Sequence, residues 1–340
     1  MSVAYNEVKA IVAGIADRNY DRVYVGITGA TNPIVASLFQ ATMAYLSSEV
    51  IPIYVQGRGT LSVRSFVASD VRDRVVAEEA LSVARSGQIR VAARLAERLK
   101  SEEDWQFLAS SLNALALWDD FDYEQAHKGL DPLEHRAAVL RSHPLLAAVA
   151  ETTSRLAEAA GKMFALAKDI RNDQKFAETV GKPDWRSTVR ETGPLLVADA
   201  LANAQRRVAE GRYTDAVLRA YRAAECATQM RLLAIGIHPQ RPDACQPAFR
   251  RFSSEEVTKG SLAFKAGLVF LAAAGQLDFA PIEDKVRDLG SLRNSTYLEH
   301  GYVRVQEAKG RKCVESSCSI CEYLLDPGIG ELSRRFEMRF

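Results

Sequence analysis

The β-strand signal of this chain is confined to one short stretch near its start, and this limits the folds that the chain can adopt. Residues 23–28 (VYVGIT) form a β-rich run, residues 34–46 (IVASLFQATMAYL) carry apolar side chains at helical spacing, and residues 49–57 (EVIPIYVQG) form a second apolar run. Two strands separated by a helix of this length predict a parallel βαβ unit. A further helix is expected over 6–19, in the same layer.

The predicted sheet is small. Three strands at most can be found, the third within 60–67 (TLSVRSFV), and this is few for a complete doubly wound sheet. The domain is either unusually small or the chain lacks its first strands.

After residue 68 the sequence is typical of amphipathic helices. The helical segments cover 71–99, 102–130, 145–170, 193–211 and 212–236, and they show no fixed-period repeat. We therefore expect a mainly α fold with an N-terminal α/β part. The predicted divisions are a partial Rossmann-like domain at 1–67, an α-helical connector at 68–190 and a helical domain at 191–340.

The composition narrows the class of protein. With 340 residues the chain is long enough for two or three domains. The formal charge of +1 argues against a broad electrostatic surface for long nucleic acid, so a nucleic-acid substrate needs a local site. The chain has no apolar run long enough to span a bilayer and no apparent leader, and its five cysteines are an odd number. We expect a cytoplasmic protein with no membrane contact.

An arginine and a histidine lie seven residues apart in LRNSTYLEHG, residues 292–301. Three of the five histidines follow an arginine at this spacing, so the spacing alone means little. The third pair differs because Arg293 and His300 continue the apolar stripe that Ile282, Val286 and Leu289 begin. Seven residues are nearly two helical turns, so on a continuous helix both side chains would lie on the packed face, roughly 10 Å apart. Gly301 then suits the end of that helix.

The pair has a chemical use. An arginine stabilises charge that develops on a phosphoryl group, and a histidine transfers protons near neutral pH. Together they suit metal-independent RNA cleavage by the substrate's own 2′-hydroxyl. In the structural alternative, Arg293 pairs with a core glutamate and His300 caps a helix end.

Three regions of the chain resemble the CARF–HEPN ribonucleases of type III CRISPR systems. The RN…HG pattern at 293–301 looks like the catalytic signature of HEPN ribonucleases, and residues 211–233 (GRYTDAVLRAYRAAECATQMRLL) resemble the helix that precedes it. Residues 25–38 (VGITGATNPIVASL) are similar to the strand–TGGTKPM–helix element of CARF domains, which bind cyclic oligoadenylate. Residues 118–126 (WDDFDYEQA) resemble the helical connector.

The resemblance implies an endoribonuclease that cyclic oligoadenylate activates. It would cleave single-stranded RNA as a homodimer, leaving 2′,3′-cyclic phosphate ends, and would use no metal and no cofactor beyond that activator. Arg293 and His300 would be catalytic, with Asn294 in support. The alternative is a non-catalytic, ligand-sensing helical protein in which the HEPN fold serves only dimerisation.

The resemblance also implies a cyclic-oligoadenylate site in the predicted strand-to-helix turn. Its residues would be Thr28, Gly29, Thr31, Asn32 and Pro33. The backbone N–H groups and the dipole of a helix start favour an anion. The turn departs from the family pattern, because Ala30 replaces a glycine and Asn32 replaces a lysine, which removes a phosphate-binding charge.

Two other patterns can be read as metal sites. Cys313, Cys318 and Cys321 have a C-x4-C-x2-C spacing, but the last two continue an apolar helical stripe, which favours core residues. The acidic WDDFD of 118–122 is expected to be an exposed loop or helix start.

Overall fold

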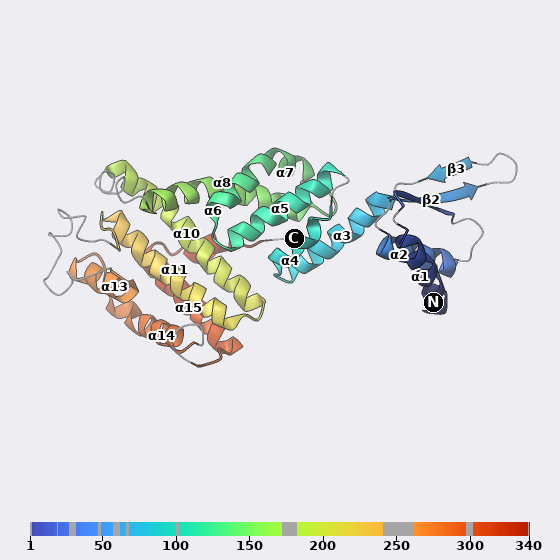
Figure 1. Cartoon of the computed structure of the whole chain (residues 1–340). Helices are drawn as coiled ribbons and strands as arrows, with labels where there is room; N and C mark the ends of the chain where they lie inside the picture. The colour runs from blue at the N-terminus through green and yellow to red at the C-terminus, as the bar shows by residue number, and fades with distance from the viewer. Residues whose placement is uncertain are drawn as a thin grey trace. The chain divides into compact units, whose positions relative to one another are not determined.

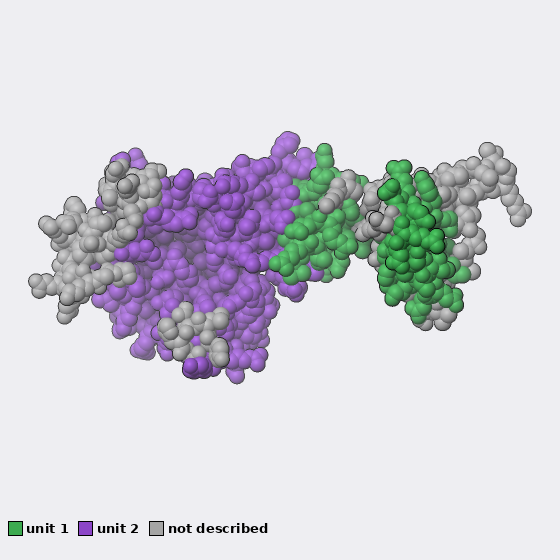
Figure 2. All heavy atoms as spheres, viewed as in Figure 1, with its two compact units in different colours: residues 1–82, 91–109 green, residues 83–90, 110–340 purple. Residues whose placement is uncertain are grey.

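The computed structural model describes residues 2–18, 20–26, 32–46, 49–56, 62–65, 68–99, 102–171, 182–240, 262–296, 302–338 and 340. The chain divides into two compact units, which Figure 2 distinguishes by colour: residues 1–82 with 91–109, and residues 83–90 with 110–340. The predicted three-part division stays a prediction, although helix α10 runs without interruption through the expected boundary at 190/191.

The N-terminal part of the first unit is a small α/β layer structure (Figure 1). Its elements in chain order are α1 (Ser2–Ala16), β1 (Arg22–Gly26), α2 (Asn32–Tyr45), β2 (Glu49–Gln56) and β3 (Ser62–Ser65). β1 and β2 are parallel with α2 between them in sequence, which confirms the predicted βαβ unit. α1 and α2 pack side by side, as expected.

The sheet has the order β1-β2-β3, and β3 runs antiparallel to β2. A proline lies in the middle strand, at Pro52, opposite Val25 of β1. Proline has no N–H to donate, so it is tolerated only where one side of the strand is unpaired. Among the described residues, the register with β3 begins at Ile53, one residue after this proline, which agrees with that condition.

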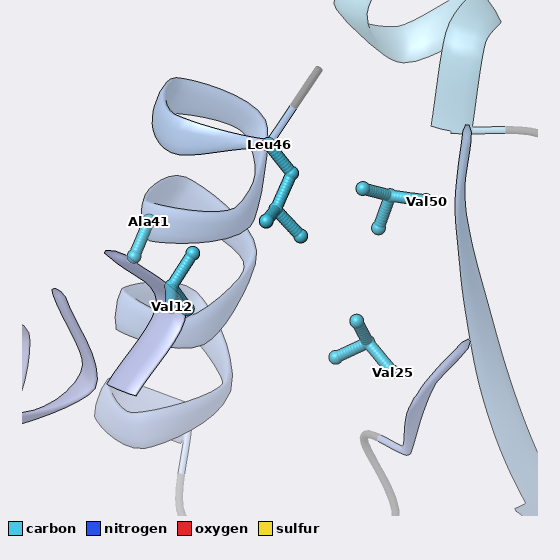
Figure 3. Close-up of a cluster of buried hydrophobic side chains, with 5 residues drawn as sticks. All are labelled: Val12, Val25, Ala41, Leu46 and Val50. Atoms are coloured by element: carbon cyan, nitrogen blue, oxygen red, sulfur yellow. The ribbon is translucent and has the colours of Figure 1, made fainter. Parts of the chain in front are cut away.

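A five-residue apolar core joins the sheet to both helices (Figure 3). Its members are Val12 of α1, Val25 of β1, Ala41 of α2, Leu46 just after α2, and Val50 of β2. α1, β1, α2 and β2 each contribute at least one side chain to this core, so the parallel pair of strands has a packed face although the sheet is small. The first unit also contains most of α3 (Ala68–Arg85), most of α4 (Ile89–Ala96) and the first part of α5 (Glu103–Asp119).

The second unit is helical. After α5 it contains α6 (Tyr123–Leu130), η1 (Asp131–Leu133), α7 (Glu134–Leu140), α8 (Ala147–Arg171), α10 (Pro183–Ala209), α11 (Tyr213–Ala234), α13 (Phe264–Ala273), η4 (Ala280–Ile282), α14 (Glu283–Ser295), α15 (Glu307–Leu324) and α16 (Ile329–Arg334). The predicted mainly α fold with an N-terminal α/β part is therefore confirmed.

Helix α11 contacts α10, α13, α14 and α15, and so it is the centre of the C-terminal bundle (Figure 1). Most of its buried residues are small, and this lets neighbouring helices approach closely. Two contacts depend on glycine: a Cβ on Gly193 of α10 would lie 2.9 Å from the Met230 sulfur, and one on Gly267 of α13 would lie 2.8 Å from Thr228 Cγ2. The tight packing fixes the position of α14, which carries the candidate site.

The acidic stretch at 118–122 is buried at Asp119, so its predicted exposure is wrong there. Asp119 is only 7% exposed; its carboxylate accepts from Arg206 Nε at 3.0 Å and also from Arg207. Burial alone would raise the pKa of Asp119, but the two guanidinium groups outweigh it and hold the pKa below its usual value. The acidic side chain thus ties the end of α5 to α10.

A second buried carboxylate completes this contact. Asp199 of α10 is fully buried and accepts hydrogen bonds from Trp118 Nε1 at 2.8 Å and from the Tyr123 hydroxyl at 2.7 Å. Burial raises the pKa of Asp199, despite the opposing charge of Arg206. Trp118, Asp119 and Tyr123 of this stretch therefore form an internal polar contact with α10.

Candidate functional site

The candidate site lies at the C-terminal end of α14. Ile282, Val286 and Leu289 are all at most 4% exposed, and Thr296 is fully buried. Arg293 lies between Leu289 and Thr296 on this stripe and is half-buried. The predicted location of Arg293 on the packed face of its helix is confirmed.

The guanidinium of Arg293 lies against an aromatic ring and donates a hydrogen bond. Its carbon lies 5.0 Å from the ring centroid of Tyr221 on α11, and its Nη1 donates to Asn294 Oδ1 at 3.0 Å. Tyr221 in turn packs edge-on against Phe264, the first residue of α13, with ring centroids 5.2 Å apart. The stack fixes one face of the guanidinium, and the amide of Asn294 fixes one of its edges.

Sequence reasoning missed Tyr221. It lies within 211–233, a segment that resembles the corresponding helix of the family. Its contact with Arg293 joins positions 72 residues apart in the sequence. An inward tyrosine in an alanine-rich helix was the available signal, because a buried phenol ring needs a specific neighbour.

α14 ends at Ser295, so the prediction of one continuous helix from Arg293 to His300 is wrong. Thr296 has extended backbone angles (φ −72°, ψ 153°), and its N–H and hydroxyl both donate to Arg293 O, at 3.2 and 2.9 Å. Two donors from one residue satisfy a carbonyl that the helix end leaves unpaired. The threonine, and not Gly301, ends the helix.

The chain returns to this helix end at Val303. The N–H of Val303 donates to Ser295 O at 3.0 Å, and an isolated parallel bridge pairs Thr296 with Val303. His300 lies outside the described residues, as do 297–299 and Gly301. The pairing of Arg293 with His300 therefore stays a prediction, whereas Arg293 and its neighbour Asn294 lie together at the helix end.

The predicted ligand turn lies between β1, which ends at Gly26, and α2, which begins at Asn32. Pro33 is in the first turn of α2, where proline is favoured. Thr28, Gly29 and Thr31 lie outside the described residues, and the side chains of Asn32 and Pro33 are not described. The predicted strand and the helix that follows it are confirmed, whereas the residues that join them lie outside the described residues; the ligand site stays a prediction.

The cysteines of α15 are largely interior. Cys313 and Cys321 are 4% and 0% exposed, while Cys318 is half-buried. The predicted core position is therefore confirmed for Cys321, whereas the burial of Cys313 was not predicted. Burial raises the pKa of Cys313 to about 12, and burial together with Glu322 raises that of Cys318 to about 11. Among the described residues, no three side chains of the metal-binding types come together.

The comparisons with known proteins agree with this architecture. Residues 186–322 match the family model described as the Csm6 HEPN domain, and this range contains α11, α14 and Arg293. Among solved structures, Enterococcus italicus Csm6 bound to cyclic hexa-2′-fluoro-hexa-dAMP is similar over 98% of this chain and 79% of that chain, with a TM-score of 0.53 and 12% sequence identity. At this identity the similarity concerns the fold. The search of curated proteins found no match.

The small α/β layer and the helical bundle are therefore the fold that this chain shares with Enterococcus italicus Csm6. Within the bundle, residues 186–322 are similar to the Csm6 HEPN domain. No helix in the described parts of the chain has both the length and the apolar character that crossing a membrane requires.

Proposed function

We propose that this protein is a metal-independent endoribonuclease that cleaves single-stranded RNA when cyclic oligoadenylate binds to its N-terminal domain. The observation that carries the proposal is the position of Arg293. A half-buried guanidinium, stacked on Tyr221 and bonded to Asn294, lies at the end of the HEPN helix with its neighbouring backbone fixed by Thr296. A charged group kept in such a place suits a bound anion.

The reaction is an internal transfer within RNA. The 2′-oxygen attacks the adjacent phosphorus, the bond to the 5′-oxygen breaks, and the proton lost from the 2′-hydroxyl is balanced by one gained at the 5′-oxygen. The products are a 2′,3′-cyclic phosphate and a 5′-hydroxyl, and no water is consumed. Arg293 would stabilise the charge on the phosphoryl oxygens, and His300 would transfer the proton. Asn294 would orient the guanidinium through the bond to its Oδ1.

The activator would bind where β1 meets α2. The parallel β1–α2–β2 arrangement directs the start of α2 and the carboxyl end of β1 toward one edge of the sheet, where ligands bind in such folds. Thr28, Gly29, Thr31, Asn32 and Pro33 would contribute hydroxyls, backbone N–H groups and an amide. The similar Enterococcus italicus protein is bound to a cyclic hexanucleotide of this kind.

A homodimer would complete the nuclease site, because HEPN sites of this family combine two copies of the motif. Each copy of the chain would then contribute its own Arg293 and His300 to one shared site.

The deciding experiment measures cleavage of a fluorescent single-stranded RNA in EDTA, with and without cyclic tetra- or hexa-adenylate. The test variant is Arg293→Ala/His300→Ala. The matched control is Arg287→Ala, because Arg287 lies on the same helix but is 66% exposed and pairs with Asp284 at 2.7 Å. We expect cleavage that requires the ring, survives in the control and is lost in the double variant.

The other outcomes separate the alternatives. Cleavage that is lost in the double variant but does not need the ring would support the nuclease activity and contradict activation by cyclic oligoadenylate. Cleavage that appears only when EDTA is replaced by a divalent metal ion would contradict the metal-independent mechanism. No cleavage under any condition would favour the non-catalytic, ligand-sensing alternative.

A further inference from the structure

A short exposed segment follows the candidate site. The side chain of Tyr302 is 86% exposed, that of Val303 is 43% exposed, and Arg304 is also exposed. The backbone is nevertheless fixed on both sides: the N–H of Val303 donates to Ser295 O at 3.0 Å, and Val305 is buried at 2% exposure. The segment therefore presents a large aromatic side chain on a fixed backbone.

Its distance from Arg293 is limited by that hydrogen bond. The 3.0 Å bond and standard backbone geometry place the Cα of Tyr302 within about 8 Å of the Cα of Ser295. Ser295 is two residues after Arg293 and directly follows Asn294. The phenol ring thus starts close to the candidate site, and it is far more exposed than that of Tyr221.

The charge around this segment favours a polyanion. Residues 302–312 contain Arg304, Lys309, Arg311 and Lys312 against a single acidic residue, Glu307, and all five are exposed. Arg311 pairs with Glu307 at 2.8 Å, which leaves the other three cations outside that pair. The chain as a whole has a formal charge of only +1, so these residues are a local concentration of positive charge in the sequence directly after the candidate site.

An exposed aromatic ring with cations beside it is how proteins hold single-stranded nucleic acid, because every base has a face that stacks and every nucleotide carries a phosphate. We propose that Tyr302 stacks on a base of the RNA next to the cleaved bond and that Arg304 contacts a neighbouring phosphate. The inference rests on the proposed function, and it adds the residues that bind the strand.

Binding is measured by fluorescence anisotropy of the full-length protein with a labelled 2′-O-methyl oligoribonucleotide. This probe cannot be cleaved through its 2′-oxygen, so binding is separated from chemistry. The variants are Tyr302→Ala, Tyr302→Phe and Arg304→Ala. Tyr323→Ala is the matched control, because Tyr323 is also an exposed tyrosine of this domain, at 42%.

We expect Tyr302→Ala to raise Kd roughly tenfold, in line with the loss of one stacked base, and Tyr302→Phe to stay within about twofold. Arg304→Ala should lower the slope of log Kd against log salt by about 0.7, the value for one phosphate on a single strand, whereas Tyr302→Ala leaves the slope unchanged. The control should bind as the native protein does.

Three results would overturn the inference: native-like binding by Tyr302→Ala, failure of the native protein to bind the probe, or dissociation of the oligomer by Tyr302→Ala in sedimentation. The last would assign Tyr302 to a contact between copies of the chain. Parallel assays on unmodified RNA separate the two proposals. Binding without cleavage contradicts the proposed function alone, and cleavage with an unchanged KM in Tyr302→Ala contradicts this inference alone.

Discussion

At the scale of single residues, the stack of Arg293 on Tyr221 and of Tyr221 on Phe264 is the contact most specific to the site. A cation held over an aromatic face contributes about 0.5–2 kcal/mol, according to how far it is desolvated. Arg293 is half-buried, which places it within this range. The ring of Tyr221 orients the guanidinium, and its hydroxyl is not needed for that role.

Replacing Tyr221 by leucine should therefore lower kcat for RNA cleavage about tenfold, whereas Tyr221→Phe should keep most of the activity. Leucine removes the π face, and phenylalanine keeps both that face and the packing on Phe264. Single-turnover cleavage at saturating RNA measures the effect, and the thermal midpoint of each variant reports any loss of packing. Equal loss of kcat in the two variants would show that the ring does not position Arg293.

At the scale of secondary-structure elements, the end of α14 limits where the proposed catalytic pair, Arg293 and His300, can meet. The apolar stripe correctly predicted that Arg293 faces inward, because each member of a stripe depends only on local periodicity. The stripe could not predict that the helix stops at Ser295. That stop depends on the pairing of Thr296 with Val303, a contact between two chain segments that helical periodicity does not encode.

Substitutions of Thr296 test whether its hydroxyl stabilises the end of α14. Thr296→Val keeps the shape but removes the donor to Arg293 O, and it should cost about 1–2 kcal/mol of stability. Thr296→Ser retains the donor and should cost less. Chemical unfolding followed by circular dichroism compares the two, and RNA cleavage shows whether Arg293 moves with the cap. A Val variant as stable as the Ser variant would contradict the role of the hydroxyl.

The buried contact between α5 and α10 was missed for a similar reason. Acidic residues at 119 and 120 are equally polar in sequence, and only the fold brings Arg206 and Arg207 to the first of them. Asp120 remains on the surface and pairs with Arg90, whose side chain is 65% exposed. The resemblance of WDDFDYEQA to a connector element was the available signal that these residues have a specific environment.

Asp119→Asn should destabilise the second unit by about 1.5–3 kcal/mol at pH 7, because Arg206 and Arg207 lose one of their two carboxylate partners, keeping Asp199 and Glu210 respectively. The matched change Asp120→Asn should cost less than about 1 kcal/mol. Thermal unfolding of the full chain compares the two, and equal effects would contradict the assignment.

The stability that the Asp119 carboxylate contributes should depend on pH. The pKa of Asp119 is lower in the folded protein than in the unfolded chain, so its contribution is present above the unfolded value of about 3.9 and is lost as pH falls through the folded value. The stability difference between the native protein and Asp119→Asn should therefore shrink below about pH 4. A difference that stays constant there would show that the carboxylate is not ionised in its contact with the arginines.

At the scale of the whole molecule, the fold class was predictable because the β signal is local and the rest of the chain has helical periodicity. The three strands, their parallel first pair and the helical remainder all followed from these patterns. The proposed function was less predictable, because it involves RNA, cyclic oligoadenylate and a second copy of the chain, and none of these is encoded in the periodicity of one sequence.

Binding of the ring should stabilise the protein by mass action. With cyclic oligoadenylate at about 100 times its Kd, linkage adds about 2.7 kcal/mol to the stability of the unit that binds it. A rise in the thermal midpoint is therefore expected in the native protein and not in Thr28→Ala/Thr31→Ala. Linear oligoadenylate is the ligand control. An equal rise with the linear form would contradict recognition of a ring.

The last prediction concerns the proposed homodimer. If each active site needs Arg293 and His300 from two copies of the chain, a separated subunit has no complete site, and specific activity should rise with protein concentration until dimers predominate. Sedimentation at the same concentrations gives the dimer fraction. Excess Arg293→Ala protein should then lower the activity of the native protein by drawing its subunits into mixed dimers, whereas excess Arg287→Ala should not, because Arg287 lies on the exposed face of α14. Constant specific activity over a range in which sedimentation finds monomers would mean that one chain holds a complete site.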